Sequence, residues 1–415
     1  MLRALKNKNF RIFFGGQIIS ISGSLMQLVA LNWLAYALTH SAFLLGVVNF
    51  ARHGPAFFLG LFTGPLLDRW DRRRVLFWTY LVTALLSLAL ALLIFSPYLT
   101  IGYVIFIATL QGCVNALDTP GRQSFIADLF EKKEELSNAI PLDSSVMNIA
   151  RLVGPSLGGV LIAATNEGVC FLINAVCYLL AIFTLLFIKI PPKKNKKATQ
   201  PLLQEIKEGI LYTASNKAIW SLLLLVSLLS LVGIPFIVLM LPIYAKDIFH
   251  AGPQALGFLH TGWAIGAISG ALYLASRKGT HGFKKKILSA SLLFGLSLIL
   301  FSQTKTLWLS LLVIPLSGFL RMIQMAGSNT LIQTVVSEEM RGRVMTFFAM
   351  TFIGVAPFGS LVAGSLASRF GAPATVLLGG VLCCLGALFF VFKLRTIKEP
   401  SAKKILEQTP PIDVV

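Results

Sequence analysis

Long apolar runs separated by short polar segments occupy most of the chain. Six runs precede a longer polar stretch near the middle of the sequence, and six follow it. Each is long enough to cross the hydrocarbon core of a bilayer, which takes roughly 20 residues of α-helix. The pattern predicts an all-α membrane protein whose twelve transmembrane helices lie at 10–38, 42–67, 75–95, 99–121, 137–165, 168–189, 218–245, 252–275, 286–303, 306–335, 342–369 and 372–393.

The composition also favours lipid over water as the solvent. Of the 415 residues, 56% are hydrophobic and 13% are charged, whereas soluble domains carry about a quarter charged residues. The segment 1–11 is basic, but the apolar run that follows is too long for the core of a cleavable signal peptide. We therefore interpret that run as the first spanning helix.

The positions of lysine and arginine predict the orientation of the chain. If the N-terminus is placed in the cytoplasm, the cytoplasmic segments carry 30 basic residues and the opposite loops carry 3. Because basic residues concentrate in cytoplasmic loops, both termini are expected in the cytoplasm of a bacterial cell with the helices in its inner membrane. The net charge of +19 then meets anionic lipid headgroups, and no nucleic acid partner is needed.

The central polar stretch divides the sequence into two halves with similar features. One run of the first half opens with Leu45-Gly46, and its counterpart in the second half opens with Leu256-Gly257. Repeats with a site at their interface are typical of secondary transporters. We predict an N-terminal six-helix bundle at 1–189, a cytoplasmic central loop at 190–217, a C-terminal six-helix bundle at 218–394 and a cytoplasmic tail at 395–415.

The most specific motif closes the second apolar run. Gly64 is followed by Asp68 and Arg69, and then by Arg72 and Arg73. Asp68 and Arg72 stand four residues apart, a spacing at which side chains on a helix can pair. An ordinary basic turn would explain the arginines, but it would not require Gly64 and Asp68 at this spacing.

This turn resembles the motif between helices 2 and 3 of the major facilitator superfamily, which runs Gly-x-x-x-Asp-Arg-x-Gly-Arg-[Arg/Lys]. The chain matches it at the five residues just named and has Asp71 where glycine is usual. The resemblance implies that Asp68 and the arginines form a cytoplasmic gate that helps hold the outward-facing state. The change at Asp71 leaves the shape of the turn open.

The resemblance extends over nearly the whole chain and is closest to the branch with macrolide-efflux and enterobactin-exporter proteins. The stretches that carry it are 115–123, 150–155, and 329–333 followed by 341–344. It implies efflux of a drug or siderophore, driven by proton antiport.

Charged residues inside the predicted helices point to the cargo. Arg52, Arg151 and Arg321 lie within spans, as do Asp118 and Asp143. A charge at bilayer depth costs at least ~2.5 kcal/mol, so it should face a partner or a wet cavity. Three arginines against two aspartates leave a positive surplus, and arginine binds carboxylates through two hydrogen bonds. We expect an anionic substrate; the alternative is that Asp–Arg pairs, such as Asp143 with Arg151, only hold helices together.

Polar residues at helical spacing mark two candidate cavity walls. Gln111, Asn115, Asp118 and Arg122 follow one face of the fourth span, and Arg321 with Gln324 follows the tenth. Each stripe is equally explained by a polar seam between helices. A milder stripe in the first span comprises Gln17, Ser20, Ser24 and Gln27.

Proton coupling requires a titratable group in the pathway. We expect Asp118 and Asp143 to carry protons, with His53 and His260 as further candidates because histidine titrates near neutrality. A lone histidine in a spanning helix is, however, more often a hydrogen-bonded packing residue.

No cofactor, metal or catalytic group is expected. The five cysteines lie in apolar runs without metal-binding spacing. Gly154-Pro155-Ser156-Leu157-Gly158 matches the GxSxG of hydrolases, but that motif requires a strand-to-helix turn. The sequence also lacks a Walker motif.

These observations favour a monomeric secondary transporter that exports a small amphipathic, anionic molecule by alternating access, with protons and membrane lipids as its other partners. An importer or a lysolipid transporter of the same fold is the alternative. A membrane-embedded enzyme or sensor is less consistent with the sequence, because it offers neither a catalytic constellation nor a sizeable soluble domain.

Overall fold

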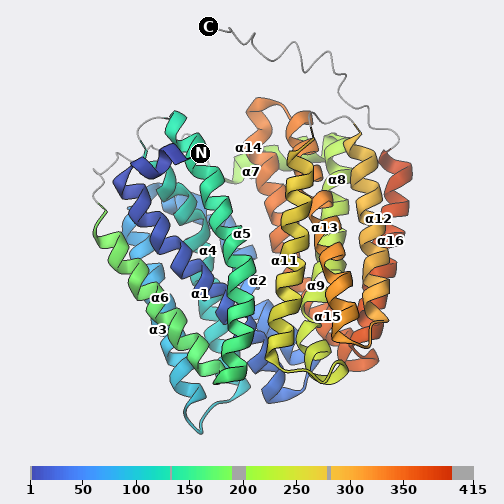
Figure 1. The fold of residues 1–415 in the computed structure, drawn as a ribbon. Coiled ribbons are helices and arrows are strands. Elements are labelled where there is room, and N and C mark those ends of the chain that lie inside the picture. The colour runs from blue at the N-terminus through green and yellow to red at the C-terminus, as the bar shows by residue number, and fades with distance from the viewer. Residues whose placement is uncertain (1, 131–132, 189–201, 278–281, 395–415) are drawn as a thin grey trace.

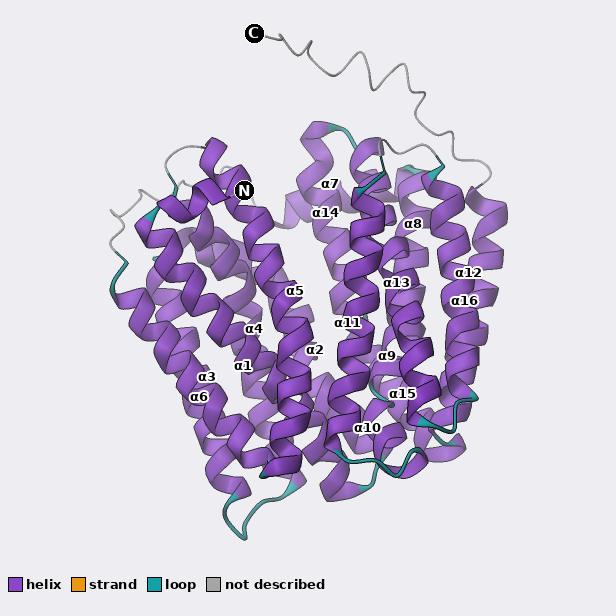
Figure 2. Cartoon of the chain, viewed as in Figure 1, coloured by secondary structure: helices purple, strands orange, loops and turns teal. Residues whose placement is uncertain are grey.

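The computed structural model describes residues 2–130, 133–188, 202–277 and 282–394, which are helical apart from short turns. Figure 2 shows helices throughout these ranges, joined by short loops. They include twelve helical spans long and apolar enough to cross a membrane. The twelve predicted runs are therefore confirmed as helices.

Six long helices make up the first half of the chain. They follow the short 3-10 helix η1 (Leu2–Lys6) and are α1 (Lys8–Thr39), α2 (Ala42–Arg69), α3 (Arg72–Ile94), α4 (Ile101–Asp128), α5 (Lys133–Ala164) and α6 (Glu167–Leu186).

The second half has six spans, two of which are broken into several pieces. Its elements are α7 (Leu202–Ser215), α8 (Lys217–Leu228), η2 (Leu229–Gly233), α9 (Ile234–Val238), α10 (Leu241–Ile243), η3 (Tyr244–Ile248), α11 (Pro253–Ala275), α12 (Phe283–Ser302), α13 (Leu307–Val335), α14 (Glu338–Ala349), η4 (Met350–Gly354), α15 (Ala356–Phe370) and α16 (Ala372–Leu394). Here η2, η3 and η4 are π-helical turns.

Proline accounts for the broken spans. In the seventh span, η2 precedes Pro235 and η3 follows Pro242, while in the eleventh span η4 precedes Pro357. Proline lacks the backbone N–H that continues a helix, and membrane helices accommodate it through local π-helical turns. Such turns occur frequently at functional sites.

Short polar side chains fix where the helices begin. Asn7 accepts hydrogen bonds from the backbone of Asn9 and Phe10 at the start of α1, and Ser41 accepts one from Leu44 at the start of α2. These N-caps satisfy backbone donors that a helix leaves unpaired. His40, in the left-handed conformation with φ 47°, ends α1 and allows a tight turn into α2.

The spans form two groups that stand side by side. Figure 1 shows α1–α6 in one group and α8–α16 in the other. The start of α1 and the end of α16 lie on the same side of the molecule, which we call the termini side; the α1–α2 turn lies on the opposite side, which we call the far side. The groups meet where α2 packs on α15 and α5 packs on α11.

Two glycine pairs bring the halves into close contact near the far side. A Cβ added at Gly46 in α2 would lie 3.3 Å from the Cα of Gly364 in α15 and 2.5 Å from the carbonyl oxygen of Ser360. A Cβ added at Gly257 in α11 would lie 3.2 Å from the Cα of Gly159 in α5. Only glycine allows these backbones to approach so closely.

Two further glycine contacts, one in each half, reveal the internal repeat. A Cβ added at Gly112 in α4 would meet the carbonyl oxygen of Arg52, and one added at Gly318 in α13 would meet that of Trp263. Arg52 lies six residues after Gly46, and Trp263 lies six residues after Gly257. Equivalent helices therefore pack in equivalent ways in the two halves.

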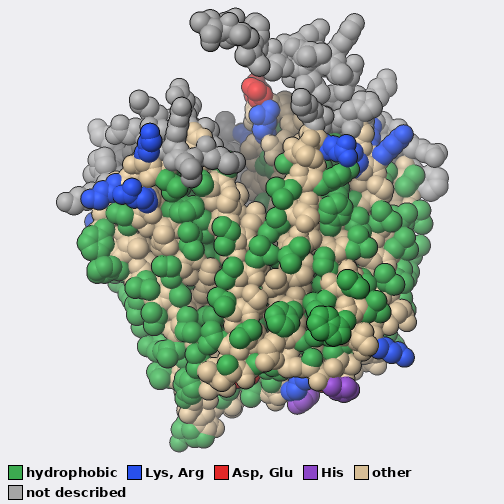
Figure 3. All heavy atoms as spheres, in the orientation of Figure 1, with side chains coloured by type: hydrophobic (Ala, Val, Ile, Leu, Met, Phe, Trp, Pro, Cys, Tyr) green, Lys and Arg blue, Asp and Glu red, His purple; other side chains and the backbone are tan. Residues whose placement is uncertain are grey.

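The outer surface matches a membrane environment. Figure 3 shows hydrophobic side chains over most of the visible face, with most of its lysine and arginine side chains on the termini side. A broad apolar belt with basic residues at one edge is expected of a chain that crosses a bilayer.

Candidate substrate pathway

The halves are closed against each other on the far side. Tyr36 of α1 donates a hydrogen bond to the carboxylate of Asp247 in η3, and the amine of Lys246 lies 6.0 Å from the centroid of the Tyr36 ring. Deeper in the molecule, the rings of Phe50 and Phe358 lie 5.4 Å apart. Figure 3 shows the molecule hollowed between the halves on the termini side. The interior is therefore accessible from the termini side in this conformation.

Arg52 is a buried charge in the N-terminal half, with 8% of its surface exposed. Its Nη1 donates to the amide oxygen of Gln111 in α4 at 2.9 Å. Its Nε and the amide nitrogen of Gln111 have no hydrogen-bond partner. Within the described ranges, no carboxylate lies within 4.0 Å of its guanidinium. Gln111 thus leaves the Nε donor of Arg52 unsatisfied and the charge of its guanidinium unneutralised.

Arg321 is the corresponding buried charge of the C-terminal half, with 3% of its surface exposed. It donates to Gln324 and, at 2.9 Å, to Ser230 of η2, while its Nε has no partner. The guanidinium carbon lies 5.3 Å from the centroid of the Phe352 ring in η4. Two π-helical turns therefore contact this charge, and the described part of the chain places no acidic side chain within ion-pair distance of it.

A third buried arginine, Arg122, does have acidic neighbours. Its Nη1 donates to Gln17 of α1 at 3.1 Å, and Gln17 donates to the hydroxyl of Tyr80 in α3 at 2.5 Å. Asp118 and Asp143 lie near enough to favour the charge of Arg122, although no carboxylate of the described residues comes within 4.0 Å of its guanidinium. We call these five residues, from α1, α3, α4 and α5, the Arg122 cluster.

Asp118 is held in this cluster from a second side. The hydroxyl of Thr79 in α3 donates to its carboxylate at 3.5 Å. Asp118 is half-buried, and its carboxylate lies near the positive charge of Arg122.

The helix-1 stripe forms a seam between helices. Gln17, Ser20 and Gln27 are all buried, and Ser24 bonds to Tyr178 of α6 at 2.8 Å. Burial of polar groups with partners is the usual arrangement inside a bundle. The stripe therefore does not line an open cavity in this conformation.

Arg151 and Asp143 do not form the pair that their shared helix suggested. No ion pair joins them within the described ranges, because eight residues of helix separate them by about 12 Å. Asp143 is half-buried near Arg122. Arg151, expected to be buried, is exposed and needs water or a lipid headgroup around its charge.

Three other candidates are placed individually. Asn115 is half-buried, and His53 is exposed next to Arg52. His260 of α11 is half-buried, and its Nε2 has no hydrogen-bond partner.

The termini-side turn is described in part. Arg72 makes a two-oxygen ion pair with Asp128 of α4 at 2.9 Å, and Arg73 donates to the carbonyl oxygen of Leu186 at 3.1 Å. Asp71 begins α3 as its N-cap, with φ −66°. That angle needs no glycine, which explains how the turn forms without the usual residue. The surroundings of Gly64 and the side chains of Asp68 and Arg69 lie outside what the structure describes.

Sequence reasoning missed part of the site because it placed the end of the fourth span too early. The apolar run was predicted to end at 121, although Arg122 was placed on the same polar stripe as Asp118. The structure continues α4 to Asp128 with Pro120 inside it, so Arg122 lies within the bundle and Asp128 reaches Arg72. Tyr80 and Ser230 were missed because neither lies on a polar stripe.

Nothing in the described residues resembles a metal or redox centre. No three His, Cys, Asp or Glu side chains lie close enough there to hold a metal ion. The five cysteines are unpaired.

Comparison with known proteins gives a family match over the whole chain. The transmembrane secretion effector family matches residues 1–414. A staphyloferrin A transporter of Staphylococcus aureus is 28% identical over 94% of this chain and 97% of its own length. Macrolide efflux protein A of Streptococcus pyogenes is 24% identical over 91% of this chain and 93% of its own.

Solved structures show the same fold. A bacterial homologue of the human lysosomal transporter Spinster, in an inward-facing and occupied conformation, superposes with a TM-score of 0.74 at 14% identity, covering 95% of this chain and 98% of its own. The nucleoside transporter NupG superposes with a TM-score of 0.73 at 16% identity, covering 94% and 100%. The resemblance to major facilitator transporters inferred from the sequence is confirmed.

Proposed function

The chain belongs to the transmembrane secretion effector family of major facilitator transporters, and we propose that it exports a small amphipathic, anionic molecule across the bacterial inner membrane. Transport proceeds by alternating access and is coupled to proton antiport. The protein is a multi-pass transporter rather than an enzyme, and its substrate binds between the two halves.

The observation that carries this proposal is an unneutralised arginine in each half. Arg52 and Arg321 are both buried, and each bonds to neutral oxygens while its Nε lacks a partner. A buried charge without a counterion is costly. A carboxylate on the substrate would neutralise such a guanidinium and accept two hydrogen bonds from it.

The conformation supports loading from the termini side. The far side is held closed by the glycine pairs and by Tyr36 with Asp247. Rocking of the halves about the central site would open the far side and close the termini side, as in other secondary transporters. With the termini in the cytoplasm, this sequence of events loads substrate from the cytoplasm.

The Arg122 cluster is the proposed site of proton coupling. Asp118 and Asp143 both interact with Arg122, and Asp118 also accepts from Thr79. Protonation of either carboxylate would remove its attraction for Arg122 and free the side chain to rearrange. A proton taken up here can thereby favour one arrangement of α1, α4 and α5 over another.

The named relatives support the cargo class and the direction. Macrolide efflux protein A and the multidrug efflux pump Tap of Mycolicibacterium fortuitum are efflux proteins. A third relative transports the siderophore staphyloferrin A. The efflux proteins favour export for this chain, and the siderophore transporter favours an anionic chelator as its substrate. The alternatives are import, which is transport in the opposite direction by the same fold, and transport of a lysolipid as a different substrate.

Replacing the two arginines tests the proposal. Arg52→Gln and Arg321→Gln should each raise the concentration of a carboxylate siderophore needed for half-maximal export by about tenfold or more, because a hydrogen bond to a charged group contributes roughly 1.5–3 kcal/mol. Export is measured as loss of labelled siderophore from loaded cells. Arg277→Gln, on an exposed residue, is the matched control.

Two results would contradict the proposal. Unchanged export by both variants, at equal amounts of protein in the membrane, would remove the arginines from the pathway. Faster entry of the siderophore into cells that contain the protein would establish import instead.

A further inference from the structure

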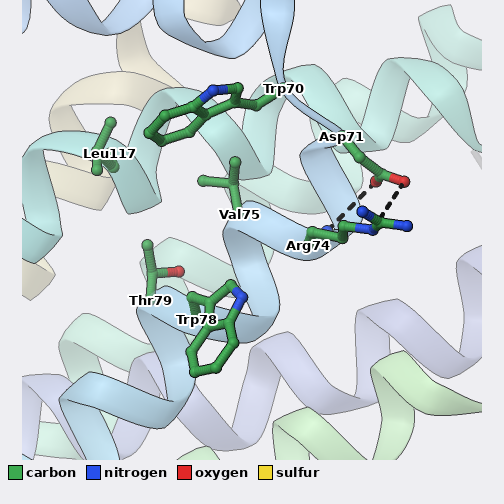
Figure 4. Close-up of a pocket in the computed structure, with 7 residues that line it drawn as sticks. All are labelled: Trp70, Asp71, Arg74, Val75, Trp78, Thr79 and Leu117. Carbon is green, nitrogen blue, oxygen red and sulfur yellow. Dashed lines mark hydrogen bonds and ion pairs between the residues drawn. The ribbon is translucent and has the colours of Figure 1, made fainter.

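A pocket lies outside the substrate pathway, at the termini-side end of α3. It has a volume of about 500 Å³ and is mostly apolar, within the roughly 300–1,000 Å³ of small-molecule sites. Figure 4 shows its lining side chains, which come from the α2–α3 turn, α3 and α4. They are Trp70, Asp71, Arg74, Val75, Trp78, Thr79 and Leu117.

The mouth of this pocket faces lipid. Trp78 is 61% exposed, and on the same side of α3 follow Leu85 and Leu92, which are also exposed. Their spacing of seven residues places all three on one face of the helix. Large apolar side chains exposed in a row along a spanning helix contact the acyl chains of the bilayer. The pocket therefore opens at the end of a lipid-facing stripe.

The chemistry of the mouth is that of the membrane interface. Trp70, 51% exposed, follows the end of α2, and Trp78 lies in the second turn of α3, so both stand near the ends of spanning helices, where tryptophan is enriched in membrane proteins. The side chain of Arg74 is 84% exposed and lies one turn before Trp78 on the same face of α3. Its Nε lies 4.0 Å from Oδ2 of Asp71, while Oδ1 of Asp71 accepts from the backbone N–H groups of Arg73 and Arg74. The Arg74–Asp71 contact is therefore a long one on a side chain that is mostly exposed.

We propose that this pocket binds one anionic phospholipid, with its phosphate at Arg74, its glycerol region between the two tryptophans and the start of an acyl chain against Val75 and Leu117. Charge favours an anionic lipid over a zwitterionic one, because most of the lysine and arginine side chains on the face shown in Figure 3 lie on the termini side and each attracts an anionic surface. The apolar lining excludes a purely ionic ligand such as free phosphate.

The bound lipid would sit next to the Arg122 cluster. Thr79 lines the pocket and also donates to the carboxylate of Asp118. One side chain therefore separates the lipid from that carboxylate. The binding of lipid stands independently of the proposed export, since it requires neither substrate nor protons.

Quenching of tryptophan fluorescence by brominated lipid tests the proposal. Protein is placed in vesicles of unbrominated lipid that contain a rising fraction of phosphatidylglycerol or phosphatidylcholine brominated near the start of the acyl chain. The double variant Trp70→Phe/Trp78→Phe supplies the background from the other four of the six tryptophans. After its subtraction, brominated phosphatidylglycerol should quench at a lower fraction than brominated phosphatidylcholine.

Two further variants test the charge and the volume separately. Arg74→Gln should raise the half-saturating fraction of phosphatidylglycerol about fivefold, from the attraction of roughly one basic residue, while the exposed control Lys217→Gln leaves it unchanged. Val75→Phe, which fills the pocket, should reduce the maximum quenching. Equal quenching by the two lipids, or an Arg74→Gln variant that matches the control, would show ordinary boundary lipid and overturn the proposal.

Discussion

Three buried arginines differ in what surrounds their charge. Arg122 interacts with two aspartates, whereas Arg52 and Arg321 meet only neutral groups among the described residues. A charge at the centre of a spanning helix costs about 2.5–3.5 kcal/mol. The two aspartates partly offset the charge of Arg122 without a direct ion pair among the described residues, so Arg122 suits a role in coupling. The other two are uncompensated, so they suit an incoming anion.

Asp118→Asn tests the coupling role at the scale of a single residue. The amide keeps the size of the side chain and its acceptor for Thr79 but cannot take up a proton. Export should lose its dependence on the pH gradient while binding of substrate is retained. The measurement is siderophore efflux at several external pH values, with exposed Glu339→Gln as the matched control. Efflux by Asp118→Asn that keeps the full pH dependence would exclude Asp118 as the main proton carrier.

Gln17→Leu tests how much the hydrogen bonds of the Arg122 cluster stabilise the fold. Gln17 accepts from Arg122 and donates to Tyr80, so leucine would leave both buried partners unsatisfied. Each unsatisfied group costs about 1–3 kcal/mol, and the midpoint of thermal unfolding in detergent should fall. Gln123→Leu, an exposed change on α4, should leave it unchanged; an equal shift in both variants would show that the cluster adds no stability.

Sequence patterns predicted the helices well and their internal breaks poorly. The apolar runs located all twelve spans, because membrane spans need nearly uninterrupted apolar residues. They did not predict η2 or η4, because proline alone does not mark a break: Pro120 and Pro315 lie inside continuous helices, whereas Pro235 and Pro357 follow π-helical turns. The end of α4 was missed because Pro120 usually stops a soluble helix, whereas a spanning helix continues through it.

The helix contacts near the far side give a prediction at the scale of elements. A methyl group at Gly46 would meet the backbone oxygen of Ser360 at 2.5 Å, so Gly46→Ala should push α2 away from α15 and favour opening on the far side. In a cysteine-free background, a cysteine at position 360 should then react faster with an impermeant maleimide added from that side.

A second glycine supplies the control for this experiment. Gly60 lies on the same helix with nothing within 4 Å of an added Cβ, so Gly60→Ala should not change the labelling rate. Equal rates in Gly46→Ala and Gly60→Ala would show that the glycine pair does not hold the far side closed.

The two halves of the molecule share an architecture and differ in chemistry. Gly112 and Gly318 pack in equivalent ways. At equivalent positions of the repeat, however, Arg52 corresponds to Trp263. Arg321 likewise corresponds to Asn115, each three residues after its glycine. The repeat could be predicted from glycine positions because helices whose backbones are in close contact require glycine at the contact. The partners of the charges could not, because Ser230 and Tyr80 reach them only through the tertiary fold.

For the molecule as a whole, we propose that an anionic cargo moves outward in exchange for protons. The most direct test uses inside-out membrane vesicles with an acidic interior imposed, and compares a carboxylate siderophore with its methyl ester. We predict that vesicles with the protein accumulate the carboxylate, that the ester enters no faster than into vesicles without the protein, and that collapse of the pH gradient abolishes accumulation. Equal uptake of both compounds would exclude recognition of the carboxylate, and uptake unaffected by collapse of the gradient would exclude proton-driven export.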